Sequence, residues 1–310
     1  MSGEDAPSRS YYGTPILQRP AWELRRVAGY FFLGGLAGAS SVLAAGAQLT
    51  GRTRLARRLK VGALGALGLS TAALIDDLGR PERFAMMLRV FRPTSPMSVG
   101  SWLLAAYGPA AGTAALTAVT GRLPRVGSAA TAGAAAIGPG IASYTAVLLA
   151  DTAVPFWNNG FRQLPFVFTG SAAASAGGLG LLTAPVEEAG PARRAALFGA
   201  GLELAASQAL RTGLGDAAPA LVQGPAAGLH EAARGLTLAG AVGAVLGRRS
   251  RMLSALSGLA LLAGSAFTRF AVFAAGQEST VDPGYVVGPQ RARIAARQAE
   301  GDGSHACDSG

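Results

Sequence analysis

Long apolar stretches dominate the sequence and leave few folds open to it. A helix of about 20 mostly apolar residues is long enough to cross the hydrocarbon core of a bilayer, and eight segments of the chain meet this description. We therefore expect an all-α integral membrane protein with eight transmembrane helices. The segments are Val27–Leu49, Leu59–Leu78, Ser98–Thr120, Val126–Ala150, Pro165–Ala184, Ala192–Leu214, Ala226–Leu246 and Met252–Ala274.

Three of these segments carry charged residues that make them weaker candidates for transmembrane helices. The second ends in Asp76 and Asp77, the sixth contains Glu203, and charged residues around His230 crowd the start of the seventh. Six or seven spans therefore remain possible, although eight accounts for the most residues. The expected organisation is a polar segment 1–26, a membrane domain 27–274 and a polar tail 275–310.

The composition agrees with a membrane protein and excludes several other classes. Charged residues make up only 14% of the chain, whereas soluble domains carry about 25%. A single cysteine, Cys307, excludes a disulfide scaffold. Of the two histidines, His230 and His305, the second lies in the polar tail, so the membrane segments cannot supply the two facing ring nitrogens that hold a haem. An iron–sulfur cluster needs several thiolates. We expect no haem, no iron–sulfur cluster and no metal site in this chain.

The net charge of +10 is assigned here to membrane topology, and we expect no nucleic-acid partner. With eight spans both termini lie on one side, called side A, together with the linkers 79–97, 151–164 and 215–225. Side B holds the shorter linkers, and the excess of Lys and Arg lies there. Because basic residues in short loops favour the cytoplasm, we expect side B to be cytoplasmic and side A exoplasmic, in the inner or cytoplasmic membrane of the cell.

Side A also gathers the aromatic and ionisable side chains. All three tryptophans lie there or at its helix ends, and side B has no Trp or Tyr. An interfacial aromatic belt would occupy both sides, so this asymmetry favours a docking or ligand surface. Charged groups at membrane depth are costly and usually face a cavity or a partner. The asymmetry therefore directs attention to Asp76, Asp77 and Arg269.

Glu203 lies deeper than the other ionisable groups. Glu203, Ser207 and Arg211 follow i, i+4 spacing and share one helix face. This arrangement suits a proton pathway through Glu203 and Arg211. A buried, protonated glutamate that bonds to a neighbouring helix fits equally well.

The linker 79–97 is expected to lie in the membrane interface. Phe84, Met87, Leu88 and Phe91 recur at helical spacing after Pro81, which predicts a short amphipathic helix. Arg83, Arg89 and Arg92 occupy its polar face, where they would contact anionic lipid or a partner protein.

Several motifs resemble the signatures of one known family. They are Leu78-Gly-Arg-Pro-Glu-Arg-Phe84, the run from Met87 to Trp102, Tyr30-Phe-Phe-Leu-Gly-Gly-Leu-Ala-Gly-Ala-Ser40, Ser143-Tyr-Thr-Ala-Val-Leu-Leu149 and Arg269-Phe-Ala-Val-Phe-Ala-Ala-Gly276. The chain is similar, from about residue 11 to residue 290, to the NrfD/polysulfide reductase membrane subunits, the quinone-reactive anchors of modular molybdenum oxidoreductases.

The resemblance implies eight helices in two four-helix bundles, without haem. It also implies a ferredoxin-like iron–sulfur subunit docked on the quinone-site side, often with a molybdopterin catalytic subunit beyond it. The family's quinone-site tyrosine corresponds to Tyr144. One departure is that the family's Tyr-Thr-Gly pattern reads Tyr144-Thr145-Ala146 here, so an added methyl group changes the cavity's shape.

The resulting hypothesis is a membrane subunit that exchanges electrons between a partner iron–sulfur subunit and the quinone or quinol pool, whether menaquinone or ubiquinone. Tyr144 would donate to a quinone carbonyl, Asp76, Asp77 or Asp151 would shuttle protons, and Arg80 and Arg269 would stabilise developing negative charge. The residues expected at the partner-docking surface are Tyr12, Trp22, Arg83, Arg89, Arg92 and Trp157.

Two alternatives come from other classes. One is a solute transporter or proton channel, which an intramembrane Glu203 and Gly/Pro-interrupted spans would suit. The sequence has no convincing internal repeat, however, and its ionisable groups gather at one side. The other is a passive anchor without quinone chemistry.

Overall fold

The computed structural model describes residues 24–78, 80, 82–214, 219–222 and 224–280, and within these ranges every regular element is helical. The long helices have 20 to 29 residues. They are α1 (Leu24–Leu49), α2 (Thr53–Asp77), α4 (Pro96–Thr120), α5 (Pro124–Ala150), α7 (Leu164–Thr183), α8 (Gly190–Gly213), α10 (Gly224–Leu246) and α11 (Arg251–Ser279). Three short helices lie between them, namely α3 (Glu82–Met87), α6 (Pro155–Asn159) and α9 (Pro219–Val222).

Proline and glycine mark the helix ends. Pro96 and Pro124 occupy the first turns of α4 and α5, where the missing N–H costs nothing and the fixed φ suits a helix. Gly121 ends α4 in the left-handed conformation, with φ of 70°. Ser250 caps α11 by accepting a hydrogen bond from the Leu253 N–H at 3.3 Å. These signals are local, so the predicted segments agree with the observed helices within a few residues, except that α2 begins earlier and α11 continues to Ser279.

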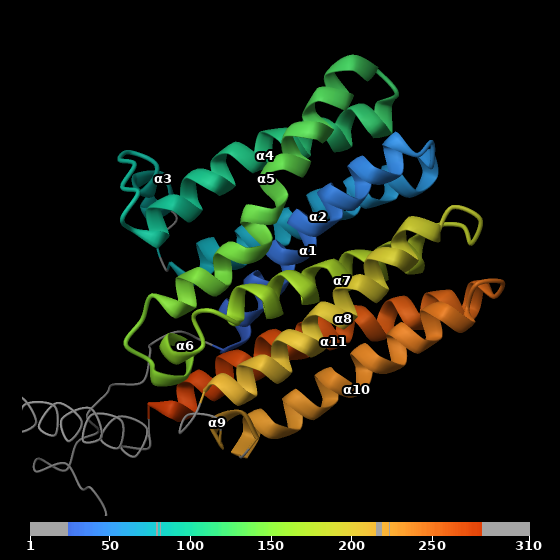
Figure 1. Cartoon of the computed structure of the whole chain (residues 1–310). Helices are drawn as coiled ribbons and strands as arrows, with labels where there is room; N and C mark the ends of the chain where they lie inside the picture. The colour runs from blue at the N-terminus through green and yellow to red at the C-terminus, as the bar shows by residue number, and fades with distance from the viewer. Residues whose placement is uncertain (1–23, 79, 81, 215–218, 223, 281–310) are drawn as a thin grey trace, which may run out of the picture.

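The long helices run alternately up and down (Figure 1). The loops after α1, α4, α7 and α10 lie at one end of the molecule, at the upper right of Figure 1, and this end is side B. The short helices α3, α6 and α9 lie at the opposite end, which is side A. The described elements therefore alternate between the two sides as the sequence predicts.

The long helices pack in two sets that meet along α1 and α7. In the first set α1 contacts α2 and α5, and α4 contacts α2 and α5. In the second set α7 contacts α8 and α11, and α10 contacts α8 and α11. Between the sets α1 packs against α7 and α11, and α5 packs against α7. At one of the closest crossings a Cβ on Gly138 of α5 would lie 2.5 Å from the Gly38 carbonyl oxygen of α1, so glycine is required there.

Six of the described helices are long and apolar enough to cross a membrane: α1, α2, α4, α5, α7 and α11. Helices α8 and α10 are also long enough to cross a membrane, but their charged residues lower the mean hydropathy, so they are not among these candidates. Of the eight spans expected from the sequence, six are therefore candidates by length and composition, and the other two correspond to helices of similar length.

The linker 79–97 is less helical than expected. The helix α3 ends at Met87, and the backbone from Val90 to Arg92 is irregular. Ser98 accounts for part of this difference, because its hydroxyl donates to the Val90 carbonyl at 3.1 Å and accepts from the Arg92 N–H at 2.9 Å. Such side-chain bonds offer the backbone an alternative to a helix. Phe91 leaves the predicted helix and packs edge-on against Trp102, with 6.2 Å between ring centroids.

Candidate functional site

A cavity of about 380 Å³ lies within the first set of helices, at side A. We call it the tyrosine cavity. Its polar lining comes from Tyr30, Ser70, Asp77, Ser101, Tyr144 and Thr145, with Arg83 from α3. Most of the remaining wall is apolar, as in small-molecule sites in general; Val27, Leu74, Leu104, Ile141 and Leu148 contribute to it.

Tyr144 reaches the cavity from the last part of α5. Its hydroxyl donates a hydrogen bond to the Pro96 carbonyl in the first turn of α4. A Cβ on Gly100, one turn further along α4, would overlap the phenol ring. Because Gly100 has no side chain, the Tyr144 ring fits against α4 at this position. The glycine on α4 and the tyrosine on α5 are therefore complementary in size.

Tyr30 and Asp77 lie on the same cavity. Tyr30 is an electrostatic neighbour of both Tyr144 and Asp77. Ser70 of α2 donates to the Tyr30 carbonyl at 3.0 Å and so ties α2 to α1 beside the cavity. In the sequence, Tyr30 is marked only by its place in the motif that runs to Ser40. Tyr30 lies near Tyr144 because of the way in which α1 packs against α5, and no local sequence pattern predicts that packing.

Thr145 contributes a polar atom without a partner. Its side chain is only 6% exposed, and its Oγ1 has no hydrogen-bond partner among the described residues. A buried hydroxyl without a partner is costly, because it loses its bond to water and gains nothing in return. Since Thr145 lines the tyrosine cavity, a ligand that accepts or donates a hydrogen bond there would remove this cost.

The other carboxylates expected near Tyr144 lie outside the cavity. Asp76 is exposed and forms an ion pair with Arg26 of α1 at 3.2 Å. Asp151 is exposed at the C-terminal cap of α5. Arg80 is exposed as well and does not line the cavity. Of the residues expected at the quinone site, the structure places Tyr144 and Asp77 on the tyrosine cavity and leaves Asp76, Asp151 and Arg80 off it.

Arg269 is also absent from the cavity wall, although it lies close behind it. Its side chain is fully buried in α11, where the guanidinium stacks on the Phe168 ring at 4.0 Å and donates to the Phe168 carbonyl at 2.8 Å. The Nη2 atom would lie 3.2 Å from a Cβ on Gly35 of α1, next to Gly34 in the cavity wall. Arg269 therefore joins the two sets of helices rather than contacting a ligand in the tyrosine cavity.

A second cavity, of about 220 Å³, lies within the second set of helices, and we call it the arginine cavity. At its inner end Glu203 is buried and accepts hydrogen bonds from Thr268 and, at 3.5 Å, from Thr237. Toward side A its polar lining continues with Ser207, Gln208, Arg211, His230 and Arg234. Glu203 and Arg211 thus line one cavity, as their spacing predicts, and Arg269 is the electrostatic neighbour of Glu203 on the far side.

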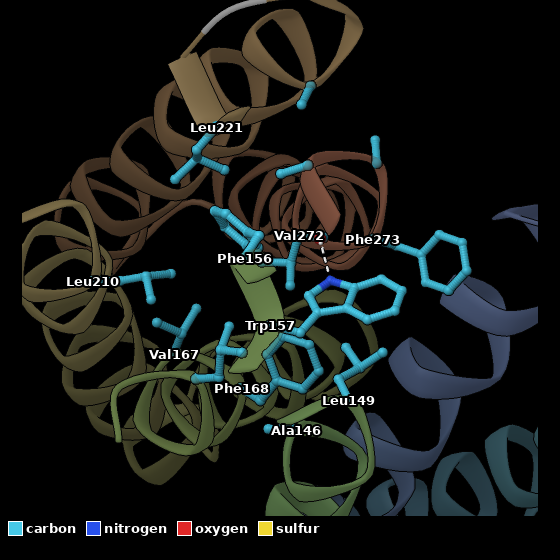
Figure 2. Close-up of a cluster of buried hydrophobic side chains, with 14 of the residues drawn as sticks. Ala146, Leu149, Phe156, Trp157, Val167, Phe168, Leu210, Leu221, Val272 and Phe273 are labelled. Atoms are coloured by element: carbon cyan, nitrogen blue, oxygen red, sulfur yellow. Dashed lines mark hydrogen bonds between the residues drawn. The ribbon is translucent and has the colours of Figure 1, made fainter. Parts of the chain in front are cut away.

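The residues expected at the docking surface differ in their exposure. Arg89 and Arg92 are exposed at side A, while Arg83 is exposed and also lines the tyrosine cavity. Tyr12 and Trp22 lie outside the described residues. The expectation for Trp157 is wrong: its side chain is completely buried, and its Nε1 donates to the Val272 carbonyl at 2.8 Å (Figure 2).

The surroundings of Trp157 explain this correction. The short helix α6 turns inward, so that the indole packs on Phe273 of α11 with 5.3 Å between ring centroids, and Leu149 and Phe156 join the same cluster (Figure 2). A Cβ on Gly276 would overlap the indole ring. A tryptophan in a linker predicts an interfacial side chain, but this loop folds back into the core.

Within the described ranges no group of three His, Cys, Asp or Glu side chains is placed to hold a metal ion. Among curated proteins, comparison found no match for this chain. A family model described as "Polysulphide reductase, NrfD" matches residues 17–193. The match is more than half of the chain, and it includes every helix that lines the tyrosine cavity.

Proposed function

The chain belongs to the NrfD family of polysulphide reductase membrane subunits, and from this premise we propose that it exchanges electrons between a partner iron–sulfur subunit and the membrane quinone pool. Membership identifies it as a membrane subunit of a redox enzyme complex, and members generally assemble with iron–sulfur and molybdopterin subunits. The observation that carries the quinone assignment is the tyrosine cavity, in which Tyr144, Asp77 and the unpartnered Thr145 hydroxyl meet inside an apolar wall.

The cavity suits a flat, neutral ring with two carbonyl oxygens. Its volume of about 380 Å³ falls within the range of small-molecule pockets. When bound, a quinone supplies a carrier for two electrons and two protons. Thr145 offers one hydrogen bond from its free hydroxyl, and Tyr144 offers another if its phenol exchanges the Pro96 carbonyl for a ring oxygen.

Proton supply falls to the groups at the side-A rim. Asp77 lines the cavity and lies at the end of α2, so its carboxyl can pass a proton between the cavity and the surface. Arg83 lies on the same cavity and favours negative charge there. We further propose that Glu203, with Arg211 at the mouth of the arginine cavity, forms a proton pathway in the second set of helices.

Eight spanning helices in two four-helix bundles are part of the same proposal. With 24 and 23 residues, α8 and α10 are each about 35 Å long, enough to cross a hydrocarbon core of about 30 Å. Both helices run between side A and side B like their neighbours (Figure 1). The central ionisable group of α8, Glu203, is buried and faces inward, whereas Arg234 near the middle of α10 is exposed.

The docking surface is proposed at side A. Exposed Arg89 and Arg92 lie beside the tyrosine cavity and can pair with acidic groups of a soluble subunit. A cluster in that subunit would then lie near the cavity mouth. We assign side A to the exoplasmic face of the cell membrane, from the excess of basic residues on side B.

Quinone-linked turnover of the purified complex tests the assignment. Removing a hydrogen bond to the ring costs about 1 kcal/mol or more, which corresponds to a rate about fivefold to tenfold lower. We expect this loss in Tyr144→Phe and in Asp77→Asn. The control is Tyr107→Phe, because Tyr107 is buried and bonds to Ser41 at 2.7 Å, away from the cavity.

The outcomes separate the alternatives. If both cavity variants keep full turnover while the complex stays assembled, the quinone assignment is wrong. Solute flux in proteoliposomes that contain this chain alone would support a transporter. A complex that assembles but never reacts with quinone would support a passive anchor.

A further inference from the structure

Two arginines line the arginine cavity toward side A, and among the described residues its lining carboxylate, Glu203, bonds to threonines rather than to them. They are Arg211 of α8 and Arg234 of α10 at its mouth, and both are electrostatic neighbours of His230. Among the described residues no ion pair joins either guanidinium to a carboxylate. Glu231 lies near His230 but is exposed and does not line the cavity. Two arginines that converge without a counterion are a recognition site for an anion.

An exposed apolar strip continues from this mouth toward side B. Leu238 lines the cavity and is 44% exposed, and Val242 and Val245 are 57% and 40% exposed. These residues follow Arg234 by four, eight and eleven positions, so all of them lie on one side of α10. The cationic mouth and the apolar strip therefore form one continuous surface on the outside of the helix set.

We propose that the mouth of the arginine cavity and the apolar strip of α10 bind one anionic phospholipid. Its phosphate would lie between Arg211 and Arg234, and an acyl chain would follow Leu238, Val242 and Val245. Arg211 lies in the last turn of α8 at side A, at the depth of a headgroup, and Arg234 lines the same cavity from deeper in α10. A basic pocket between membrane helices is a recognised type of lipid headgroup site.

The phosphate group at this site could belong to a free phosphate ion or to a phospholipid, and the apolar strip decides between them. A free phosphate ion would use the arginines alone and would gain nothing from exposed valines beyond them. A phospholipid uses both features, since burying its chain against the strip adds hydrophobic stabilisation to the ionic contact. The proposal is independent of the quinone assignment, because no residue of the tyrosine cavity takes part.

Lipid selectivity of the purified protein, together with its co-purifying subunits, tests the site. Native mass spectrometry with added phosphatidylglycerol or phosphatidylcholine measures the ratio of their affinities. Each basic residue near an anionic headgroup contributes about 1 kcal/mol, so the double variant Arg211→Gln/Arg234→Gln should bind phosphatidylglycerol roughly 30-fold more weakly than wild type. Phosphatidylcholine binding should change little.

Two further variants keep the test decisive. Arg248→Gln/Arg249→Gln removes the same charge from exposed positions at side B and should leave the selectivity unchanged. Arg211→Lys/Arg234→Lys keeps the charge and should keep most of the preference. The proposal is overturned if the glutamine variant retains wild-type selectivity while eluting as a folded complex. It is also overturned if inorganic phosphate competes as well as phosphatidylglycerol, since the site would then bind a free anion.

Discussion

The tyrosine cavity and the arginine cavity occupy corresponding ends of the two helix sets, yet their chemistry differs. The first is mostly apolar, with two phenols, three hydroxyls, one carboxyl and one arginine. The second is smaller and collects a buried glutamate, two arginines and a histidine. The family model covers all the residues of the first cavity and none of those of the second.

This difference indicates a division of tasks within one helical framework. A neutral ring is held by apolar walls and a few placed hydrogen bonds, whereas protons and anions need charged groups. Arg269 lies between the two cavities, with Glu203 as its electrostatic neighbour on one side and the glycines of α1 on the other. The two regions are therefore separate in chemistry, and Arg269 lies close to both without lining either.

The largest expected effect comes from Glu203→Leu in the arginine cavity. Glu203 is the electrostatic neighbour of a buried charge, and a buried charge left without compensation typically costs about 3 to 5 kcal/mol. Arg269 would be that charge. We expect a clear fall in the thermal unfolding midpoint of the detergent-solubilised protein. Glu203→Gln also removes the charge and keeps only the Thr268 hydrogen bond, so it should lose nearly as much. Equal stability of the leucine variant and wild type would show that the two groups do not compensate each other.

Gly100→Ala should have the next largest effect, this time on the tyrosine cavity. The new Cβ would overlap the Tyr144 ring, and overpacking of this kind costs about 1 to 3 kcal/mol or displaces the neighbour. Quinone-linked turnover should therefore fall about tenfold or more. Gly112→Ala on the same helix is the matched control, because nothing lies within 4 Å of its added Cβ. Similar turnover in both variants would contradict a role for the Tyr144 position.

A smaller effect is expected from Thr145→Val, which removes the unpartnered hydroxyl and keeps the shape. Stability should stay nearly constant, because no hydrogen bond within the described structure is lost. The apparent KM for quinone should rise about threefold to tenfold if the hydroxyl binds the ring. Thr131→Val on the same helix is the control, since its hydroxyl already bonds to the Gly127 carbonyl at 2.6 Å. An unchanged KM for Thr145→Val would remove this residue from the site.

The smallest effect is expected from Asp76→Asn. The ion pair between Asp76 and Arg26 is exposed, and such pairs contribute about 0.5 kcal/mol or less. Turnover and unfolding midpoint should remain close to wild type, in contrast to Asp77→Asn. If Asp76→Asn abolished turnover and Asp77→Asn did not, the assignment of the two carboxylates would have to be exchanged.

These two aspartates show where prediction from sequence ends. The order of the long helices and most of their ends could be predicted, because span length, proline and glycine act locally. Neighbouring residues on a helix point about 100° apart, so only the rotation of α2 against α1 decides that Asp77 reaches the cavity and Asp76 does not. The docking prediction for Trp157 was wrong for a related reason, since the burial of its side chain depends on the path of α6 toward α11.

The burial of Arg269 also has a consequence for how the protein is made. An arginine near the centre of an isolated helix costs about 3 kcal/mol to insert into a membrane. The ring and carbonyl that receive it belong to Phe168 of α7, which is synthesised earlier. During biogenesis α11 thus gains its stabilising contacts only once α7 is in the bilayer. Among the described helices, α11 therefore carries an arginine whose stabilising contacts lie on a helix that entered the bilayer before it.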